Sequence, residues 1–208
     1  MLTVALAKGR LQGPTLERFA AAGVLLPDGW ESSRRLWLDD LSGRCRFVHV
    51  KPGDVPTYVE RGIADVGIAG GDVLLESAAN VHAPLDLRFG RCRLVVAGPS
   101  GARLDRGGTL RIGTKYPRTA RRFFESRGMT VDVIPLSGSV ELAAVTGLSD
   151  HVVDVVETGR TLEENGLEVL EVVAECTARL VVGRAAWALR GAEVRALIEA
   201  LRGGEEES

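Results

Sequence analysis

Residues 154–161 combine the residue types that binding of a phosphorylated sugar requires. Their sequence, Asp-Val-Val-Glu-Thr-Gly-Arg-Thr, joins the apolar end of a predicted buried strand to a turn of small residues, and a short helix follows. Such a segment binds anions, because unpaired backbone N–H groups and the helix dipole both favour negative charge. Asp154 and Glu157 would repel phosphate unless they bind sugar hydroxyls or a metal ion. The pattern therefore indicates a phosphorylated sugar, with or without magnesium, or a structural turn in which Thr158 and Thr161 only cap the helix.

Two other loops that follow predicted strands carry residues suited to phosphate or nucleotide. Lys8, Gly9 and Arg10 follow a strand over residues 2–7, and in open α/β sheets ligands bind where strands end. Two cations around a glycine either hold phosphates or form a solvated basic turn. In the second loop, Gly71 lets a ligand approach the backbone, and Asp72 is either a helix N-cap, the commoner role, or an acceptor for a ligand.

Composition and charge narrow the classes of function. The chain has 208 residues, of which 45% are hydrophobic and 26% charged, as in an ordinary globular protein. A net charge of -2 shows no basic excess that would indicate nucleic acid. The 3 cysteines are scattered, which favours reduced thiols and a cytoplasmic location, and no apolar run is as long as a membrane helix. The 3 histidines form no catalytic triad or metal motif, so we expect chemistry that needs no strong base or nucleophilic side chain.

The order of the predicted elements indicates an α/β protein with two lobes. Apolar strands at residues 92–97 and 178–183 have similar sequences and flank a segment with its own strands and helices. We interpret them as two crossover strands, through which the chain leaves one lobe, builds a second and returns. This predicts a periplasmic-binding-protein-like (type II) fold with an inter-lobe cleft. Lobe I is predicted over residues 1–92 plus 182–208, and lobe II over 93–181.

Five blocks of the chain resemble, in the right order, the short form of the ATP phosphoribosyltransferase family, whose members catalyse the first step of histidine biosynthesis. The resemblance covers nearly the whole chain, and five ordered blocks are far more specific than any one of them. The blocks are residues 7–11 (Ala-Lys-Gly-Arg-Leu), residues 54–60, residues 65–70, residues 114–117 (Thr-Lys-Tyr-Pro) and residues 141–162.

The resemblance implies a concrete reaction and a binding loop. N1 of ATP would attack C1 of the ribose in phosphoribosyl pyrophosphate (PRPP), giving phosphoribosyl-ATP and pyrophosphate. Mg²⁺ is the implied cofactor, held mainly through the substrate pyrophosphate, and no protein ligand is assigned to it. The loop would hold the 5′-phosphate, and its two acids would bind ribose hydroxyls or face developing positive charge. The residues expected to bind PRPP are Asp154, Val155, Val156, Glu157, Thr158, Gly159, Arg160, Thr161 and Glu141.

Two arginines are our candidates for catalysis. We expect Arg10 and Arg34 to stabilise the leaving pyrophosphate, because both are predicted near strand ends and a guanidinium binds phosphate oxygens in bidentate fashion. The residues expected to contact ATP are Lys8, Gly9, Arg10, Gly71, Asp72 and Tyr116.

The chain length bears on the partners that the resemblance implies. Long forms of the family have a further C-terminal regulatory domain, for which this chain leaves no room. The short form implies a separate regulatory subunit similar to a histidyl-tRNA synthetase, so we expect a homodimer within a hetero-oligomer, with no nucleic acid or membrane partner. The alternatives are a non-catalytic two-lobed anion- or solute-binding protein and a regulatory nucleotide-binding module. Paired acids with two arginines, and no signal peptide, favour the enzyme.

Overall fold

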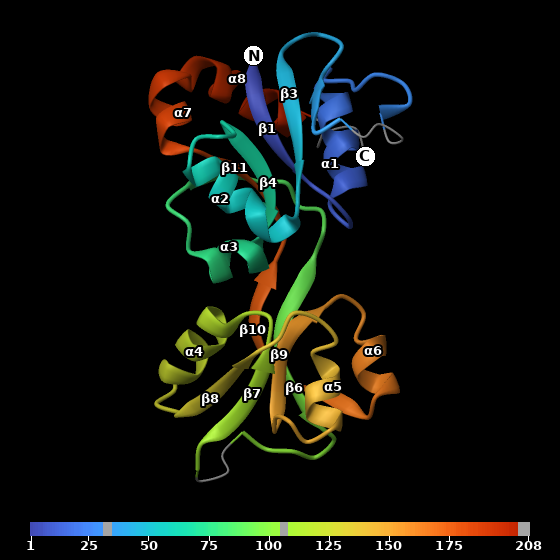
Figure 1. Cartoon of the computed structure of the whole chain (residues 1–208), viewed down its shortest axis with the longest axis vertical. Coiled ribbons are helices and arrows are strands. Elements are labelled where there is room, and N and C mark those ends of the chain that lie inside the picture. The colour runs from blue at the N-terminus through green and yellow to red at the C-terminus, as the bar shows by residue number, and fades with distance from the viewer. Residues whose placement is uncertain (31–34, 105–107, 204–208) are drawn as a thin grey trace. The chain divides into compact units, whose positions relative to one another are not determined.

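The computed structural model describes residues 1–30, 35–104 and 108–203, and the chain divides into two α/β units. Unit 1 comprises Met1–Gly90 and Thr177–Ser208, and unit 2 comprises Arg91–Cys176. Each unit has its own sheet (Figure 1). In the described ranges, no helix has the length and apolar character needed to cross a membrane.

Unit 1 contains a six-stranded mixed sheet with helices on both faces. Its strands are β1 (Leu2–Ala7), β2 (Trp37–Asp39), β3 (Cys45–Val50), β4 (Val66–Gly70), β5 (His82–Asp86) and β11 (Ala178–Val182). Its helices are α1 (Gln12–Ala21), α2 (Val55–Glu60), α3 (Gly71–Ser77), α7 (Arg184–Leu189) and α8 (Gly191–Gly203), with a 3₁₀ turn at Pro52–Asp54. The strand order is β2-β3-β1-β4-β11-β5, in which β1 is parallel to β3 and β4 and the other pairings are antiparallel.

The central strand β1 is apolar along its length because both of its faces are covered. Leu6 belongs to a core that includes Phe19 of α1 and Leu201 of α8. Ala5 points to the opposite face, into a second core with Val59 of α2. A strand buried on both faces has a continuous hydrophobic sequence, which explains why residues 2–7 were predicted as a strand.

Unit 2 contains a five-stranded mixed sheet. Its strands are β6 (Cys92–Pro99), β7 (Leu110–Thr114), β8 (Val131–Pro135), β9 (His151–Val156) and β10 (Leu167–Cys176), and its helices are α4 (Pro117–Glu125), α5 (Glu141–Val145) and α6 (Arg160–Glu164). The strand order is β10-β6-β9-β7-β8. Val152 packs with Leu162 of α6 on one face, and Val153 packs with Phe124 of α4 on the other. α6 and α4 therefore cover opposite faces of this sheet.

The prediction of two α/β lobes is confirmed, but its boundaries need correction. The units divide at 90/91 and 176/177, which is two and five residues before the predicted boundaries at 92/93 and 181/182. The second difference has a clear cause, because β11 pairs with β4 and β5 in the sheet of unit 1. The predicted crossover strand at 178–183 is therefore not the partner of β6. That partner is β10, which runs antiparallel to β6 in unit 2.

Candidate functional site

Three loops of unit 2 follow parallel strands and therefore share one edge of its sheet. β7 is parallel to both β8 and β9. The loops after Thr114, Pro135 and Val156 consequently begin at the same edge. Ligands bind at this edge in open α/β sheets. The loop after β9 is the segment predicted to bind a sugar phosphate.

A pocket of ≈ 390 Å³ lies at the loop after β9. Every residue predicted to bind PRPP lines it, including Glu141, which is distant in sequence. Glu141 begins α5, and Ala143 of that helix packs in the same core as Val152 of β9, which brings the helix start to the pocket. Val152 and Leu162 also line the pocket. We did not predict these two, because their buried apolar side chains have the pattern of core residues.

Gly159 gives the loop its conformation. Its φ of 87° lies in the left-handed region, which glycine adopts without steric cost. It occupies the N-cap position of α6, and no side chain caps this helix. The hydroxyl of Thr158 accepts from the Arg160 N–H only at 3.5 Å, the outer limit for a hydrogen bond. The alternative in which threonines merely cap the helix is therefore poorly supported.

Backbone donors of the loop remain available to a ligand. The N–H groups of Leu162 and Glu163 both donate to the Gly159 carbonyl, at 3.0 and 3.1 Å. The N–H groups of Gly159 and Thr161, by contrast, have no backbone acceptor among the described residues. Unsatisfied N–H groups at a helix start attract anions. The loop can thus present backbone donors to a phosphate group.

Two carboxylates lie beside these donors. Asp154 is half-buried, and its Oδ1 accepts from the Val155 N–H at 2.8 Å. Glu157 is exposed at the start of the loop. Both line the pocket, and their negatively charged oxygens suit sugar hydroxyls or a cation better than phosphate.

These carboxylates also bear on metal binding. Within the described ranges, no group of three or more His, Cys, Asp or Glu side chains is placed to hold a metal ion. Mg²⁺ in phosphate-using enzymes is commonly held by one or two carboxylates plus the substrate phosphates. Asp154 and Glu157 can supply that number. The residues present therefore fit a Mg²⁺ ion that is bound chiefly through the substrate.

Unit 1 places its predicted ligand residues at one edge of its own sheet. Lys8, Gly9 and Arg10 follow β1, while Gly71 and Asp72 follow the parallel neighbour β4. A pocket of ≈ 740 Å³ has Lys8 and Gly9 in its lining, together with Gln12, Gly13, Leu16, Trp30 and His49. Arg10, Gly71 and Asp72 are not in that lining. Arg10 is exposed, and its Nη1 donates to the Gly90 carbonyl at 3.2 Å.

His49 lines this pocket and packs against an aromatic ring. Its ring centroid lies 5.7 Å from that of Trp30. Burial lowers the pKa of His49, and the nearby positive charge of Lys8 lowers it further. The ring is therefore neutral near pH 7 and can act as an aromatic surface in the pocket.

Asp72 does not cap its helix, so the N-cap prediction is wrong. Gly70 is the N-cap of α3, and Asp72 lies in the first turn with only 6% of its surface exposed. Its carboxylate folds back over Gly70, where an added Cβ would lie 2.2 Å from Oδ1. A side chain at position 70 would displace the Asp72 carboxylate, and a role for Asp72 in ligand binding stays a prediction.

Of the last two predicted residues, Tyr116 lines neither pocket, and Arg34 falls outside the described ranges. Tyr116 belongs to unit 2, at the start of α4, where its N–H donates to Oγ1 of Thr114 at 2.8 Å. It does not line the pocket at the loop after β9. Arg34 lies outside the described residues.

Comparisons with known proteins show the family of the chain. The family model described as HisG, ATP phosphoribosyltransferase, matches residues 51–203. The ATP phosphoribosyltransferase of Geobacillus kaustophilus is 46% identical over 201 residues, which cover 97% of both chains. That of Sorangium cellulosum is 47% identical over 201 residues, covering 97% of this chain and 94% of the relative.

A solved structure is similar to this chain along nearly its whole length. It is the ATP phosphoribosyl transferase (HisG:HisZ) complex from Thermotoga maritima, matched with a TM-score of 0.86 and 37% identity over 98% of this chain and 97% of that chain. This likeness confirms the expected type II periplasmic-binding-protein-like fold. Family model, relatives and structure together show that the chain belongs to the ATP phosphoribosyltransferase family.

Proposed function

We propose that the protein transfers the phosphoribosyl group of PRPP to N1 of ATP and releases pyrophosphate, the first step of histidine biosynthesis. The observation that carries the proposal is the single pocket at the loop after β9, which gathers every residue predicted to bind PRPP. Membership of the family supports the same reaction. The alternative of a non-catalytic anion-binding protein is favoured by no particular feature of the described residues.

Different groups of the pocket recognise two parts of PRPP, the 5′-phosphate and the ribose. The N–H groups of Gly159 and Thr161, with the Thr158 and Thr161 hydroxyls, bind the 5′-phosphate. Asp154 and Glu157 accept hydrogen bonds from the ribose hydroxyls, and their negative charge also favours the cationic character that develops at C1 of the ribose. This division accounts for acids beside a phosphate site.

The chemistry needs little help from proton transfer. N1 of adenine is unprotonated at neutral pH, so its lone pair can attack C1 directly while the bond from C1 to the pyrophosphate oxygen breaks. The pyrophosphate leaves with the bonding electrons. Arg10 and Arg34 bind this leaving group and stabilise its charge. Mg²⁺, when bound, supplies further positive charge to the pyrophosphate oxygens, and Asp154 and Glu157 are the residues that would hold it.

The pocket in unit 1 is our assignment for ATP. Lys8 and Gly9 line it and can contact phosphate oxygens, while Trp30 and His49 offer aromatic surface for an adenine ring. Gly71, Asp72 and Tyr116 lie outside this lining and are secondary candidates for contacts with ATP.

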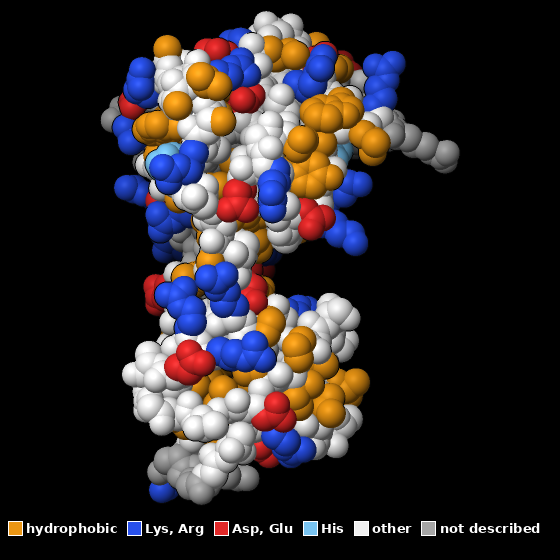
Figure 2. All heavy atoms as spheres, turned by 60° about the vertical axis from the view of Figure 1, so that its left-hand side comes forward, with side chains coloured by type: hydrophobic (Ala, Val, Ile, Leu, Met, Phe, Trp, Pro, Cys, Tyr) orange, Lys and Arg blue, Asp and Glu red, His pale blue; other side chains and the backbone are white. Residues whose placement is uncertain are grey.

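Exposed apolar side chains support assembly with other subunits. Hydrophobic side chains gather on the face of unit 1 that Figure 2 shows. Among the described residues, Leu36, Leu41 and Leu189 are 70%, 67% and 84% exposed. The matched Thermotoga maritima structure is a HisG:HisZ complex. We therefore propose a homodimer that joins a separate regulatory subunit. All three cysteines lie in the described ranges and none forms a disulfide, which supports a cytoplasmic location.

An activity assay tests the proposal directly. The purified chain is incubated with ATP, PRPP and Mg²⁺, and pyrophosphatase removes the pyrophosphate so that the product accumulates and is followed by its ultraviolet absorbance. We expect turnover, alone or with the regulatory subunit. Binding of PRPP without any product, even with that subunit added, would instead favour the anion-binding alternative.

The catalytic arginines have a separate test. Arg10→Ala and Arg34→Ala should each lower kcat while leaving the thermal unfolding midpoint nearly unchanged, because Arg10 is exposed and a leaving-group contact acts mainly in the transition state. Arg121→Ala, which removes an exposed cation from α4, is the control and should retain full activity. Full activity in both test variants would show that the assignment is wrong.

A further inference from the structure

The pocket at the loop after β9 is short of positive charge for the ligand we assign to it. Its lining residues include three carboxylates, those of Glu141, Asp154 and Glu157, and one guanidinium, that of Arg160. PRPP has phosphate groups at both ends of its ribose, so it brings several negative charges. Backbone N–H groups offset only part of them, since they are dipoles and not full charges. A further cation of unit 2 close to this pocket would correct the imbalance.

The position of Arg93 in the sheet makes it the candidate for this additional positive charge. In the antiparallel pair of β6 and β9, Arg93 lies directly opposite Val156, and Val156 lines the pocket. Side chains at opposite positions project to the same face, with Cβ atoms about 5 Å apart. Val95, two residues along β6, belongs to the core beneath α6. Arg93 therefore lies on the face that carries α6, beside the start of the loop.

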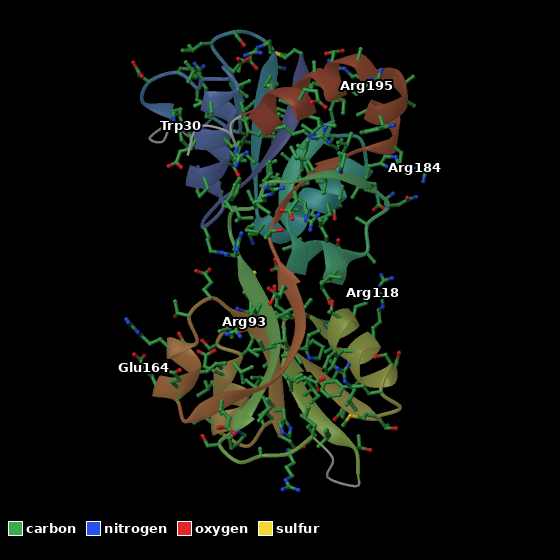
Figure 3. All side chains as sticks on the ribbon, turned by 180° about the vertical axis from the view of Figure 1, so that it is seen from behind. Trp30, Arg93, Arg118, Glu164, Arg184 and Arg195 are labelled. Atoms are coloured by element: carbon green, nitrogen blue, oxygen red, sulfur yellow. The ribbon has the colours of Figure 1, made fainter. Side chains whose placement is uncertain are left out.

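The environment of Arg93 differs from that of the rest of its strand. Cys92 and residues 94–98 are buried, whereas Arg93 is exposed in the middle of the sheet order, between β10 and β9. Figure 3 labels Arg93 on β6, on the side where the chain turns into α6. Arg93 is not itself part of the pocket lining, but its cross-strand neighbour Val156 is, which brings an extended arginine side chain within reach of the pocket rim.

No described residue satisfies the charge of Arg93. Glu175 lies opposite it on β10, but no ion pair or hydrogen bond joins the two, and Arg93 makes none with any other residue in the described ranges. Other arginines of the same unit are held by carboxylates, as Arg111 is by Asp150 and Arg127 is by Glu171. An exposed guanidinium beside a phosphate pocket, with no structural partner there, is placed to bind phosphate oxygens.

We propose that Arg93 is a further substrate-binding residue, whose guanidinium binds a phosphate group of PRPP. The inference rests on the proposed function, because it takes PRPP as the ligand of this pocket. The phosphate group is either the 5′-phosphate or the pyrophosphate, and the two share the oxygen geometry that a guanidinium recognises. Arg93 thus adds to unit 2 a contact that the loop residues do not supply.

Calorimetric titration of three ligands tests the proposal. PRPP, ribose 5-phosphate and pyrophosphate are each titrated with Mg²⁺ into the wild-type chain and into Arg93→Gln, Arg93→Lys and Arg121→Gln. We expect Arg93→Gln to bind PRPP about 10- to 100-fold more weakly, as loss of a charged hydrogen-bonding partner typically causes. Arg93→Lys should recover part of that loss, because it restores the charge without the bidentate geometry. Arg121→Gln makes the same charge change on α4, over the opposite face, and should bind as the wild type does.

The ligands identify which phosphate Arg93 binds. A selective loss with ribose 5-phosphate assigns Arg93 to the 5′-phosphate, and a selective loss with pyrophosphate assigns it to the leaving group. PRPP affinity of Arg93→Gln within twofold of the wild type, with a normal unfolding midpoint, overturns the inference and leaves the proposed function intact. If Arg93→Gln is unstable, a normal affinity in Arg93→Lys with no change in KM for PRPP overturns it instead. Failure of the wild type to bind PRPP overturns the proposed function itself.

Discussion

The loop after β9 depends, at the scale of single residues, on the backbone of Gly159. Its φ of 87° strains any residue with a side chain. An added Cβ would meet only Glu163 Oε1 and Val156 Cγ1, both at 3.9 Å, which is ordinary van der Waals contact. A substitution would therefore act through backbone conformation, and hence through the direction of the N–H groups that we assign to phosphate.

Gly159→Ala should raise KM for PRPP at least tenfold and lower the free energy of unfolding by about 1 kcal/mol. Steady-state kinetics and urea unfolding measure the two effects. Gly128→Ala is the matched control, because Gly128 in unit 2 also has a positive φ, 69°, and open space around the added Cβ. It should have a similar stability cost and an unchanged KM. Equal KM values for both variants would argue against phosphate binding by this loop.

At the scale of elements, one ion pair fixes the start of β7 to the segment before β9. Arg111 donates from Nη2 to Oδ1 of Asp150 at 2.9 Å and from its backbone N–H to Oδ2 at 2.9 Å. Its Nη1 also donates to the Gly147 carbonyl at 3.1 Å. The hydrogen bonds from the Arg111 side chain are the main reason that the pKa of Asp150 lies below its ordinary value.

This pair should make the stability of unit 2 depend on pH. Because the folded pKa of Asp150 is depressed, its stabilisation is complete above the unfolded value of about 3.9 and is lost as pH falls through the folded value. Asp150→Asn should lower the free energy of unfolding by about 1 kcal/mol at pH 7, discounted for partial exposure, and the difference from the wild type should shrink below about pH 4. Urea unfolding across pH measures it. Glu125→Gln, on the exposed surface of α4, should show no such trend.

The register of β6 and β10 also predicts which two cysteines can form a disulfide. Cys176 lies directly opposite Cys92, both buried, and opposite Cα atoms in an antiparallel pair are about 4.5–5.5 Å apart, within the range of a disulfide. Diamide, which accepts the two hydrogens, should join Cys92 and Cys176 in the folded chain. Cys45 should remain a thiol, because Leu2 and not a cysteine lies opposite it on β1 and because burial raises its pKa to about 11. Mass spectrometry of peptides reads the link, and crosslinking to Cys45 would contradict the register.

At the scale of the whole molecule, the two units differ in how the chain builds them. Unit 2 is one continuous segment, Arg91–Cys176, with a complete sheet and helices on both faces. Unit 1 is assembled from two segments, because β11 lies between β4 and β5, and Leu201 of α8 completes its core.

An excised fragment of residues 91–176 should therefore fold alone and unfold cooperatively, as circular dichroism against temperature would show. Residues 1–90 alone should fail to do so, because without β11 the strand β5 has no partner and β4 becomes an exposed edge. Addition of residues 177–208 to that fragment should restore cooperative folding. Independent folding of residues 1–90 would show that the return segment is not needed for unit 1.

The sequence by itself determined the features that lie close together along the chain. Residues 154–161 line one pocket, because a strand end, a left-handed glycine and a helix start are specified by neighbouring residues, and their binding of PRPP stays a prediction. The apolar run of β1 was equally clear, since burial on both faces leaves a continuous hydrophobic sequence. The ordered blocks of resemblance added Glu141 to the site.

The tertiary structure alone decided what depends on pairing between distant segments. A buried apolar strand has the same pattern in either sheet, so nothing local in residues 178–182 shows that β11 belongs to unit 1 and that β10 is the partner of β6. The sequence favoured Asp72 as the N-cap of its helix, whereas in the folded backbone Gly70 is the N-cap. The sequence around Arg93 predicts only a strand over residues 92–97. Only the register that sets Arg93 opposite Val156 places its charge beside the pocket at the loop after β9, because cross-strand distance is a property of the folded sheet and not of the sequence.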